Sequence, residues 1–308
     1  MKKIPVGATI AHAYRFAFGQ APTLLRAIWL PLLAQLVVVF FLIKRTALFM
    51  AAMQAQDPSA TTLFGPVLLL FPLAVILFFV QLTAAMETAL GNPPRSWFTF
   101  RLDKPMWRLL GGFLVAALAI MALMIGYLLV LYILGFLAEA TLKIPVSAGQ
   151  ARRIILLVAA GAILVGYGGM IFLAIRFLFL LAPVNVSQHQ LGLGQAWHLS
   201  AGNFWRILLI ALAILIPILL INYVYTFSLV GLPPVTLGAS KQAREAAEMT
   251  WRIAEMNAMV NRWYLTLPLT VVLMLFQFGA GCAAQVFAYR ALTENDASAP
   301  VPGNGLPD

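Results

Sequence analysis

The side chains that could carry acid–base or metal chemistry are sparse in this chain and do not cluster. None of the three histidines, His12, His189 and His198, has a second ligand three or four residues away, as a metal site on one helix requires. Glu87 and Asp103 stand apart, whereas hydrolysis needs a nucleophile with its base or two carboxylates that face one site. The sequence therefore predicts no catalytic, cofactor-binding or metal-ligating residue.

The elements that would have to position such residues are membrane helices. Hydrophobic residues make up 62% of the 308 residues, charged residues only 10%, and the mean hydropathy is +0.93. Soluble domains contain about 45–50% apolar and about 25% charged residues. The net charge of +10 could suggest a nucleic acid partner, but the Lys and Arg residues are scattered at the ends of apolar segments. We therefore expect a polytopic membrane protein whose cations contact anionic lipid head groups.

Six apolar segments are long enough for a helix to cross a bilayer, which takes about 20 residues. They comprise residues 27–43, 64–86, 109–138, 154–175, 207–231 and 263–289. These segments predict an all-α fold, a helical bundle of about six transmembrane helices that forms one domain over residues 1–292. The segment of residues 293–308 is short, acidic and rich in Pro, Gly and Ala, and this composition predicts a disordered tail.

Two further segments are predicted to be amphipathic helices. Residues 8–19 place Ile10, Tyr14 and Ala17 on one helical face, which is typical of a helix that lies in the membrane interface. Residues 240–262 begin at Ser240 and combine possible ion pairs between neighbouring turns with an apolar line. The second helix is expected to pack on its own bundle or, alternatively, to bind a partner.

Polar side chains inside the predicted spans are few. Gln35, Gln81, Asn222 and Gln277 are candidate intramembrane contacts, and such groups serve either as hydrogen-bond partners between helices or as part of a substrate path. Arg176 is followed by more apolar sequence, so it is expected where its helix leaves the membrane or, alternatively, in a pairing or functional role.

A helix elbow precedes the fifth span, in the sequence GLGQAWHLSAGNFWR of residues 192–206. Trp197, Asn203, Trp205 and Arg206 are the candidate lipid-interface or docking residues of this elbow. Aromatic rings anchor helices at head-group depth, and an arginine there contacts lipid phosphate or follows the positive-inside rule. The alternative interpretation is a docking surface or a specific head-group site.

The elbow has two weaker counterparts upstream, which predicts three repeated hairpins or, alternatively, reflects common constraints on membrane entry. An aromatic residue is followed six residues later by an amide or acid in each copy: Tyr14 and Gln20, Trp97 and Asp103, Trp197 and Asn203. If the N-terminus is cytoplasmic, eleven Lys and Arg residues lie inside and nine outside. We therefore expect cytoplasmic N- and C-termini, by a narrow margin of charge.

The run into Ala182-Pro183-Val184, followed by QAWHLSAGNFWR over residues 195–206, resembles the membrane domain of some glycerophosphoryl diester phosphodiesterases and YciC-type bacterial inner-membrane proteins. The N-terminal segment AHAYRFAFGQ agrees more weakly. In that family the phosphodiesterase chemistry belongs to a separate soluble barrel, so the resemblance implies architecture and a bacterial inner-membrane location, and no catalytic activity.

The sequence thus favours a non-catalytic structural, accessory or envelope-associated membrane protein that acts through helix and lipid contacts. A protein partner or a homo-oligomer fits this role, and no cofactor is expected. A transporter or lipid-handling permease is the alternative, and an intramembrane enzyme is the third candidate. A transporter should have a continuous polar cavity near Gln81, Asn222 or Gln277.

Overall fold

The computed structural model describes residues 2–93, 100–141, 148–188, 192–232, 234 and 240–293, and these residues are mainly α-helical, without strands. The helices are α1 (Val6–Gly19), α2 (Ala21–Gln54), α3 (Ala60–Ala89), α4 (Lys104–Thr141), α5 (Ala148–Leu178), α6 (Leu181–Gln188), α7 (Leu193–Ser200), α8 (Phe204–Val230), α9 (Lys241–Asn261) and α10 (Trp263–Thr293). The predicted tail and Trp97 lie outside the described residues, apart from Thr293, which ends α10.

Six helical segments of the described chain are long and apolar enough to cross a membrane. The six predicted spans lie within α2, α3, α4, α5, α8 and α10, apart from residue 231, which follows α8. The fourth apolar segment, Leu164–Ser187, runs on into α6 because only two residues separate α5 from α6. The chain is therefore an integral, multi-pass membrane protein with an all-α fold, as predicted.

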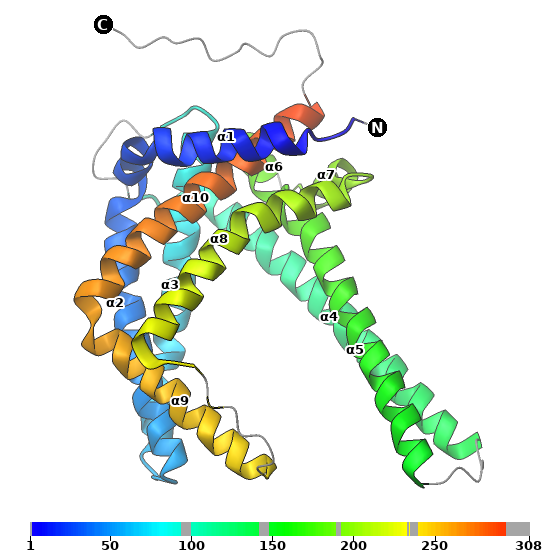
Figure 1. Cartoon of the computed structure of the whole chain (residues 1–308). Coiled ribbons are helices and arrows are strands. Elements are labelled where there is room, and N and C mark those ends of the chain that lie inside the picture. Colours follow the sequence, from blue (N-terminus) through cyan, green and yellow to red (C-terminus); the bar gives the residue numbers. More distant parts are fainter. Residues whose placement is uncertain are drawn as a thin grey trace, which may run out of the picture.

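The spans form three consecutive hairpins, α2 with α3, α4 with α5, and α8 with α10 (Figure 1). Both described chain ends lie on one side of the molecule, which we call the terminal face, together with α1, α6 and α7. Helix α9 lies on the opposite side and contacts α2, α8 and α10. Gln20, Asp103 and Asn203 each directly precede the first helix of a hairpin, so the three copies of the predicted repeat share this position.

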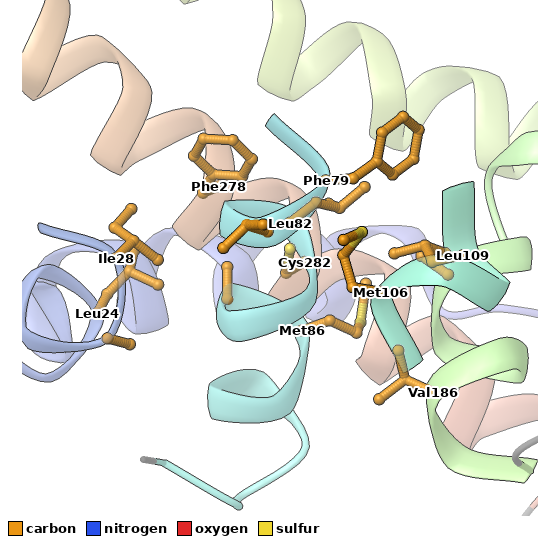
Figure 2. Close-up of a cluster of buried hydrophobic side chains, with 14 of the residues drawn as sticks. Leu24, Ile28, Phe79, Leu82, Met86, Met106, Leu109, Val186, Phe278 and Cys282 are labelled. Carbon is orange, nitrogen blue, oxygen red and sulfur yellow. The ribbon is translucent and has the colours of Figure 1, made fainter. Parts of the chain in front are cut away.

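The buried core lies toward the terminal face. One cluster joins the first turns of α2 and α4 to the last turns of α3, the second half of α10 and α6 (Figure 2). A second cluster joins Ile4 and α1 to α6, α7, the first half of α8 and α10. We call these two clusters the hub. Its largest fully buried side chains include Leu24, Ile28, Met86, Met106 and Ile207.

The hairpin of α4 and α5 leaves the hub after Ala116, which is buried. Only 6% of the most apolar part of α4 is buried, against 39% for α2 and for α10. The Tyr127 hydroxyl donates a hydrogen bond to the Ala162 carbonyl at 2.6 Å, and the Tyr127 ring lies against Gly166, where a Cβ atom would come within 2.8 Å of it. Residues 117–133 and 161–171, here called the arm, are thus braced mainly against each other.

Helix α1 lies across the hub and packs against α10. Gly279 makes this close packing possible, because a Cβ atom there would lie 3.1 Å from the Ala17 Cα atom. Tyr14 extends from α1 to α8, where its hydroxyl donates to the Ala213 carbonyl at 2.8 Å. Pro217 lacks the N–H group that would bond this carbonyl in a regular helix. Helix α1 therefore satisfies a carbonyl that the proline leaves without its usual donor.

Helix α9 was predicted over residues 240–262 and has nearly those bounds. Ser240 caps it by accepting a hydrogen bond from the Ala243 N–H group. Gln54 of α2 donates to Thr250 of α9 at 2.9 Å, which links the helix to its own bundle. The interpretation that α9 packs on its own bundle matches these contacts.

Candidate functional site at the helix elbow

The elbow, residues 192–206, comprises Gly192, α7, a turn at residues 201–203 and the first residues of α8. Gly202 has a φ of 72°, in the left-handed region that glycine adopts without strain, and this turn redirects the chain from α7 into α8. Asn203 directly precedes α8 and is buried. The turn therefore places the buried side-chain amide of Asn203 directly before the fifth span.

Asn203 and Arg206 hold the N-terminal segment of the same chain. The Asn203 side chain accepts a hydrogen bond from the Ile4 N–H group at 3.1 Å and donates one to the Lys2 carbonyl at 3.0 Å. The Arg206 guanidinium donates to the Ile4 carbonyl at 2.8 Å. Ile4 itself is fully buried in the hub. Two of the predicted lipid-interface residues thus satisfy backbone groups of Lys2 and Ile4.

Arg176, in the last turn of α5, lies against the elbow. Its guanidinium carbon is 3.6 Å from the centre of the Trp197 ring, and its Nη2 atom donates to the Trp197 carbonyl at 2.8 Å. The Ser200 hydroxyl donates in turn to the Arg176 carbonyl at 3.1 Å. A cation stacked on an aromatic face and bonded to a carbonyl is a strong local contact. The contacts of Arg176 therefore match the interpretation that it pairs.

Aromatic rings extend this contact across the junction of α5, α7 and α8. Trp197 lies 4.7 Å from Phe177, and Phe172 lies 5.0 Å from Phe204, measured between ring centres. Trp205 packs beside Phe204 at 5.0 Å but keeps 72% of its surface exposed. An exposed indole next to a span suits the membrane interface, where an aromatic ring meets both lipid and water.

The four predicted intramembrane amides do not come together as one site. The Gln81 amide donates to the Gln35 side chain, and its nitrogen also lies 3.4 Å from the Pro31 carbonyl. Both glutamines are buried between α2 and α3. Asn222 and Gln277 are exposed on α8 and α10. The first two thus link neighbouring helices, and Gln81 is fully buried, so it lines no open cavity.

Sequence reasoning missed several polar contacts. Asn185 of α6 is fully buried and accepts a hydrogen bond from the Gly192 N–H group at 2.8 Å. The Tyr225 hydroxyl is 2.6 Å from the Thr266 hydroxyl and so joins α8 to α10. The proline in α8 was a signal that could have suggested a donor near residue 213, but not that Tyr14 supplies it. No sequence signal pairs Asn185 with Gly192.

Polar side chains of the elbow bond to Arg176 and to the backbone. Within the described part of the chain, no three His, Cys, Asp or Glu residues are grouped so that they could hold a metal ion. The observed contacts of the elbow are hydrogen bonds to the backbone of residues 2–4 and the stacking of Arg176 on Trp197.

The chain matches no family model, no curated protein and no solved structure.

Proposed function

We propose that this integral membrane protein is a non-catalytic accessory protein that acts through helix and lipid contacts. The arm carries this proposal, because a hairpin attached only at one end of a bundle presents long helix faces to other molecules. As part of this proposal, the elbow sequence resembles the membrane domain of some glycerophosphoryl diester phosphodiesterases and YciC-type proteins. This resemblance supports a shared architecture and a bacterial inner-membrane location.

The partner that fits the arm is an apolar transmembrane helix. Helices in lipid associate through close packing, and small residues allow their backbones to approach. Ala119, Ala122 and Gly126 are exposed on α4, and Gly161 and Gly168 are exposed on α5. A Cβ atom at any of these three glycines would meet no other group within 4 Å. Lipid chains need no such small residues, whereas a packed helix does.

Replacing Gly126 by Leu tests this role, with Gly65→Leu as the matched control. Gly65 is exposed on α3 and is equally open, but it lies outside the arm. Native mass spectrometry from lipid nanodiscs should show a second, different chain at fixed stoichiometry. Gly126→Leu should remove that chain without changing the thermal midpoint, and Gly65→Leu should retain it. A monomer, or equal loss in both variants, would overturn the proposal. Selective transport by the pure protein would favour the permease alternative.

We also propose that the terminal face is cytoplasmic. The presumed inside cations that the structure describes belong to α1 and the segment before it, or lie near those ends of the other helices that face this side: Lys2, Lys3, Arg15, Arg26, Arg101, Lys104, Arg108, Arg176, Arg206 and Arg290. The positive-inside rule favours their retention in the cytoplasm. Reporters fused after Asp57 and after Asn203 should report the outside and the inside, respectively. A cytoplasmic Asp57 reporter would reverse the assignment.

A further inference from the structure

Helix α8 has one face that its own chain covers and one that it leaves open. Four isoleucines of the covered face are buried in the hub: Ile207, Ile210, Ile214 and Ile218. Three leucines of the open face keep between 38% and 54% of their surface exposed: Leu212, Leu215 and Leu219. The isoleucines therefore hold α8 to its own bundle, and the leucines are available to another molecule in the membrane.

The open leucines repeat at the spacing of a coiled coil. Six residues of α8 follow one another at alternating intervals of four and three positions: Leu208, Leu212, Leu215, Leu219, Asn222 and Thr226. We call this set the leucine stripe. Its first and last residues are half-buried, and the four between them are exposed. A period of 3.5 residues keeps one line of an α-helix in contact with a second helix over its whole length.

Asn222 places an amide in this stripe. It is exposed, and among the described residues it has no hydrogen-bond partner. The Tyr225 hydroxyl, one turn further along α8, is 2.6 Å from the Thr266 hydroxyl of α10. Trp263, one turn before Thr266, is exposed and is typical of the membrane interface. Asn222 therefore lies about two turns deeper than this interface, among lipid chains that offer no hydrogen bond.

A second copy of α8 supplies the partner that Asn222 lacks. A carboxamide has both donors and an acceptor, so two copies of the same amide can bond to each other. Both copies have the same orientation in the membrane, and a two-fold axis along the bilayer normal makes equal residues meet on parallel helices. In parallel coiled coils, a single Asn in the apolar seam fixes the register and the number of strands.

We propose that this chain forms a homodimer in which the leucine stripes of two α8 helices pack together and the two Asn222 amides bond to each other. The interface goes beyond the proposed accessory role. It lies on α8, whereas the arm belongs to α4 and α5, so the dimer does not use the residues assigned to the accessory partner.

Cysteine substitution along α8 tests the geometry of the interface in membranes. Cys282, the only native cysteine, is buried, so the native chain should not cross-link. Under mild oxidation with copper phenanthroline, Leu219→Cys should form a disulfide-linked dimer at least about fivefold faster than Leu220→Cys. Leu220 is equally exposed but lies beside the stripe. Leu215→Cys and Ile216→Cys form a second matched pair. Equal rates within both pairs would overturn the interface.

The role of the amide is measured by the dimer dissociation constant of the full-length chain in liposomes, from single-molecule photobleaching at a series of protein-to-lipid ratios. Asn222→Leu should weaken the dimer about fivefold, which corresponds to about 1 kcal/mol. This is within the range of hydrogen bonds between helices in membranes. Asn222→Gln should recover most of the binding, because it keeps a donor and an acceptor. Gln277→Leu removes an exposed amide from α10 and should change the constant by less than about twofold.

A native chain that stays monomeric at every ratio would overturn the homodimer, and so would an unchanged constant in Asn222→Leu. Equal losses in Asn222→Leu and Gln277→Leu would overturn it as well, because they would show a general effect of polarity. All variants should keep the thermal midpoint, since the substituted side chains are exposed. The accessory role has a separate readout, a bound chain of different mass. Retention of that chain without a homodimer refutes this interface alone, and a homodimer without that chain refutes the accessory role alone.

Discussion

Removal of the Tyr14 hydroxyl should destabilise the protein only while Pro217 is present. In the native protein this hydroxyl donates to the Ala213 carbonyl, whose usual donor in a helix is the N–H group of residue 217. The substitution Tyr14→Phe keeps the ring, which packs edge-on against Phe276 with ring centres 5.3 Å apart. It therefore isolates the hydrogen bond from the packing.

The expected cost follows from the partly buried position of the contact. A hydrogen bond contributes about 0.5–1.5 kcal/mol, and a buried carbonyl left without a donor costs about 1–3 kcal/mol. Helix-to-helix hydrogen bonds in membranes average about 0.6 kcal/mol, with a maximum near 1.7. We expect Tyr14→Phe to lower the free energy of unfolding by about 1–1.5 kcal/mol. In a Pro217→Ala background the new N–H group bonds Ala213, and the cost should fall below about 0.5 kcal/mol.

Reversible unfolding by SDS in mixed micelles, followed by tryptophan fluorescence, measures the four free energies of this double-mutant cycle. Tyr132→Phe is the control, because Tyr132 is exposed on the arm and its hydroxyl has no hydrogen-bond partner among the described residues. It should change the unfolding free energy by less than about 0.5 kcal/mol, as for other surface substitutions. The same cost of Tyr14→Phe in both backgrounds would refute the proposed link between the hydroxyl and the proline.

Four further outcomes are expected under the same unfolding assay. Arg176→Lys should lower the free energy of unfolding by about 1.5–3 kcal/mol, because an ammonium group cannot both stack on the Trp197 ring and donate to the Trp197 carbonyl as a planar guanidinium does. Wild-type stability of this variant would contradict the stack. Gln81→Leu alone should lower the free energy of unfolding by about 1–2 kcal/mol, because it leaves the Gln35 amide without its partner. Leu at both positions should leave this free energy nearly unchanged. Additive losses in the double variant would contradict the pairing. Gly279→Ala should cost about 1–3 kcal/mol by forcing α1 away from α10, and an unchanged midpoint would contradict that close contact. In uncharged lipid, the contribution of neutral His12 to the free energy of unfolding should be complete above pH 6.5, the pKa of a free histidine. It should be lost as the pH falls toward the lowered pKa of His12 in the folded protein, because the unfolded state then binds more protons. His12→Phe should abolish this pH dependence.

The sequence predicted the fold class because membrane helices are determined locally. A span needs a sufficient length of apolar residues with satisfied backbone hydrogen bonds, and both requirements can be read along the chain. The bounds of α9 were predicted equally well, since Ser240 provides the cap and the apolar line provides the period. The helices extend beyond the predicted spans because residues near the polar ends, such as Lys44 and Arg45 in α2, continue helical hydrogen bonding in the interface.

The site was predicted as a set of residues but not as a set of contacts. Trp197, Asn203 and Arg206 were singled out by residue type and by their place before a span. Their partners, Arg176 and residues 2–4, lie about 20 and about 200 positions away in the sequence. Residue type indicates that an arginine needs an anion, a carbonyl or a ring, but it does not indicate which one. That choice depends on the packing of α1, α5 and α8.

The sequence by itself determined that this is a six-span membrane protein, which segments contain the spans, and which few polar residues they carry. Only the tertiary structure decided that Gln35 meets Gln81, that Tyr14 reaches Ala213, and that the arm leaves the hub. The physical reason is that lipid solvates every apolar helix face nearly equally. Hydrophobicity therefore places the helices in the membrane, while close packing and a few hydrogen bonds select which faces meet.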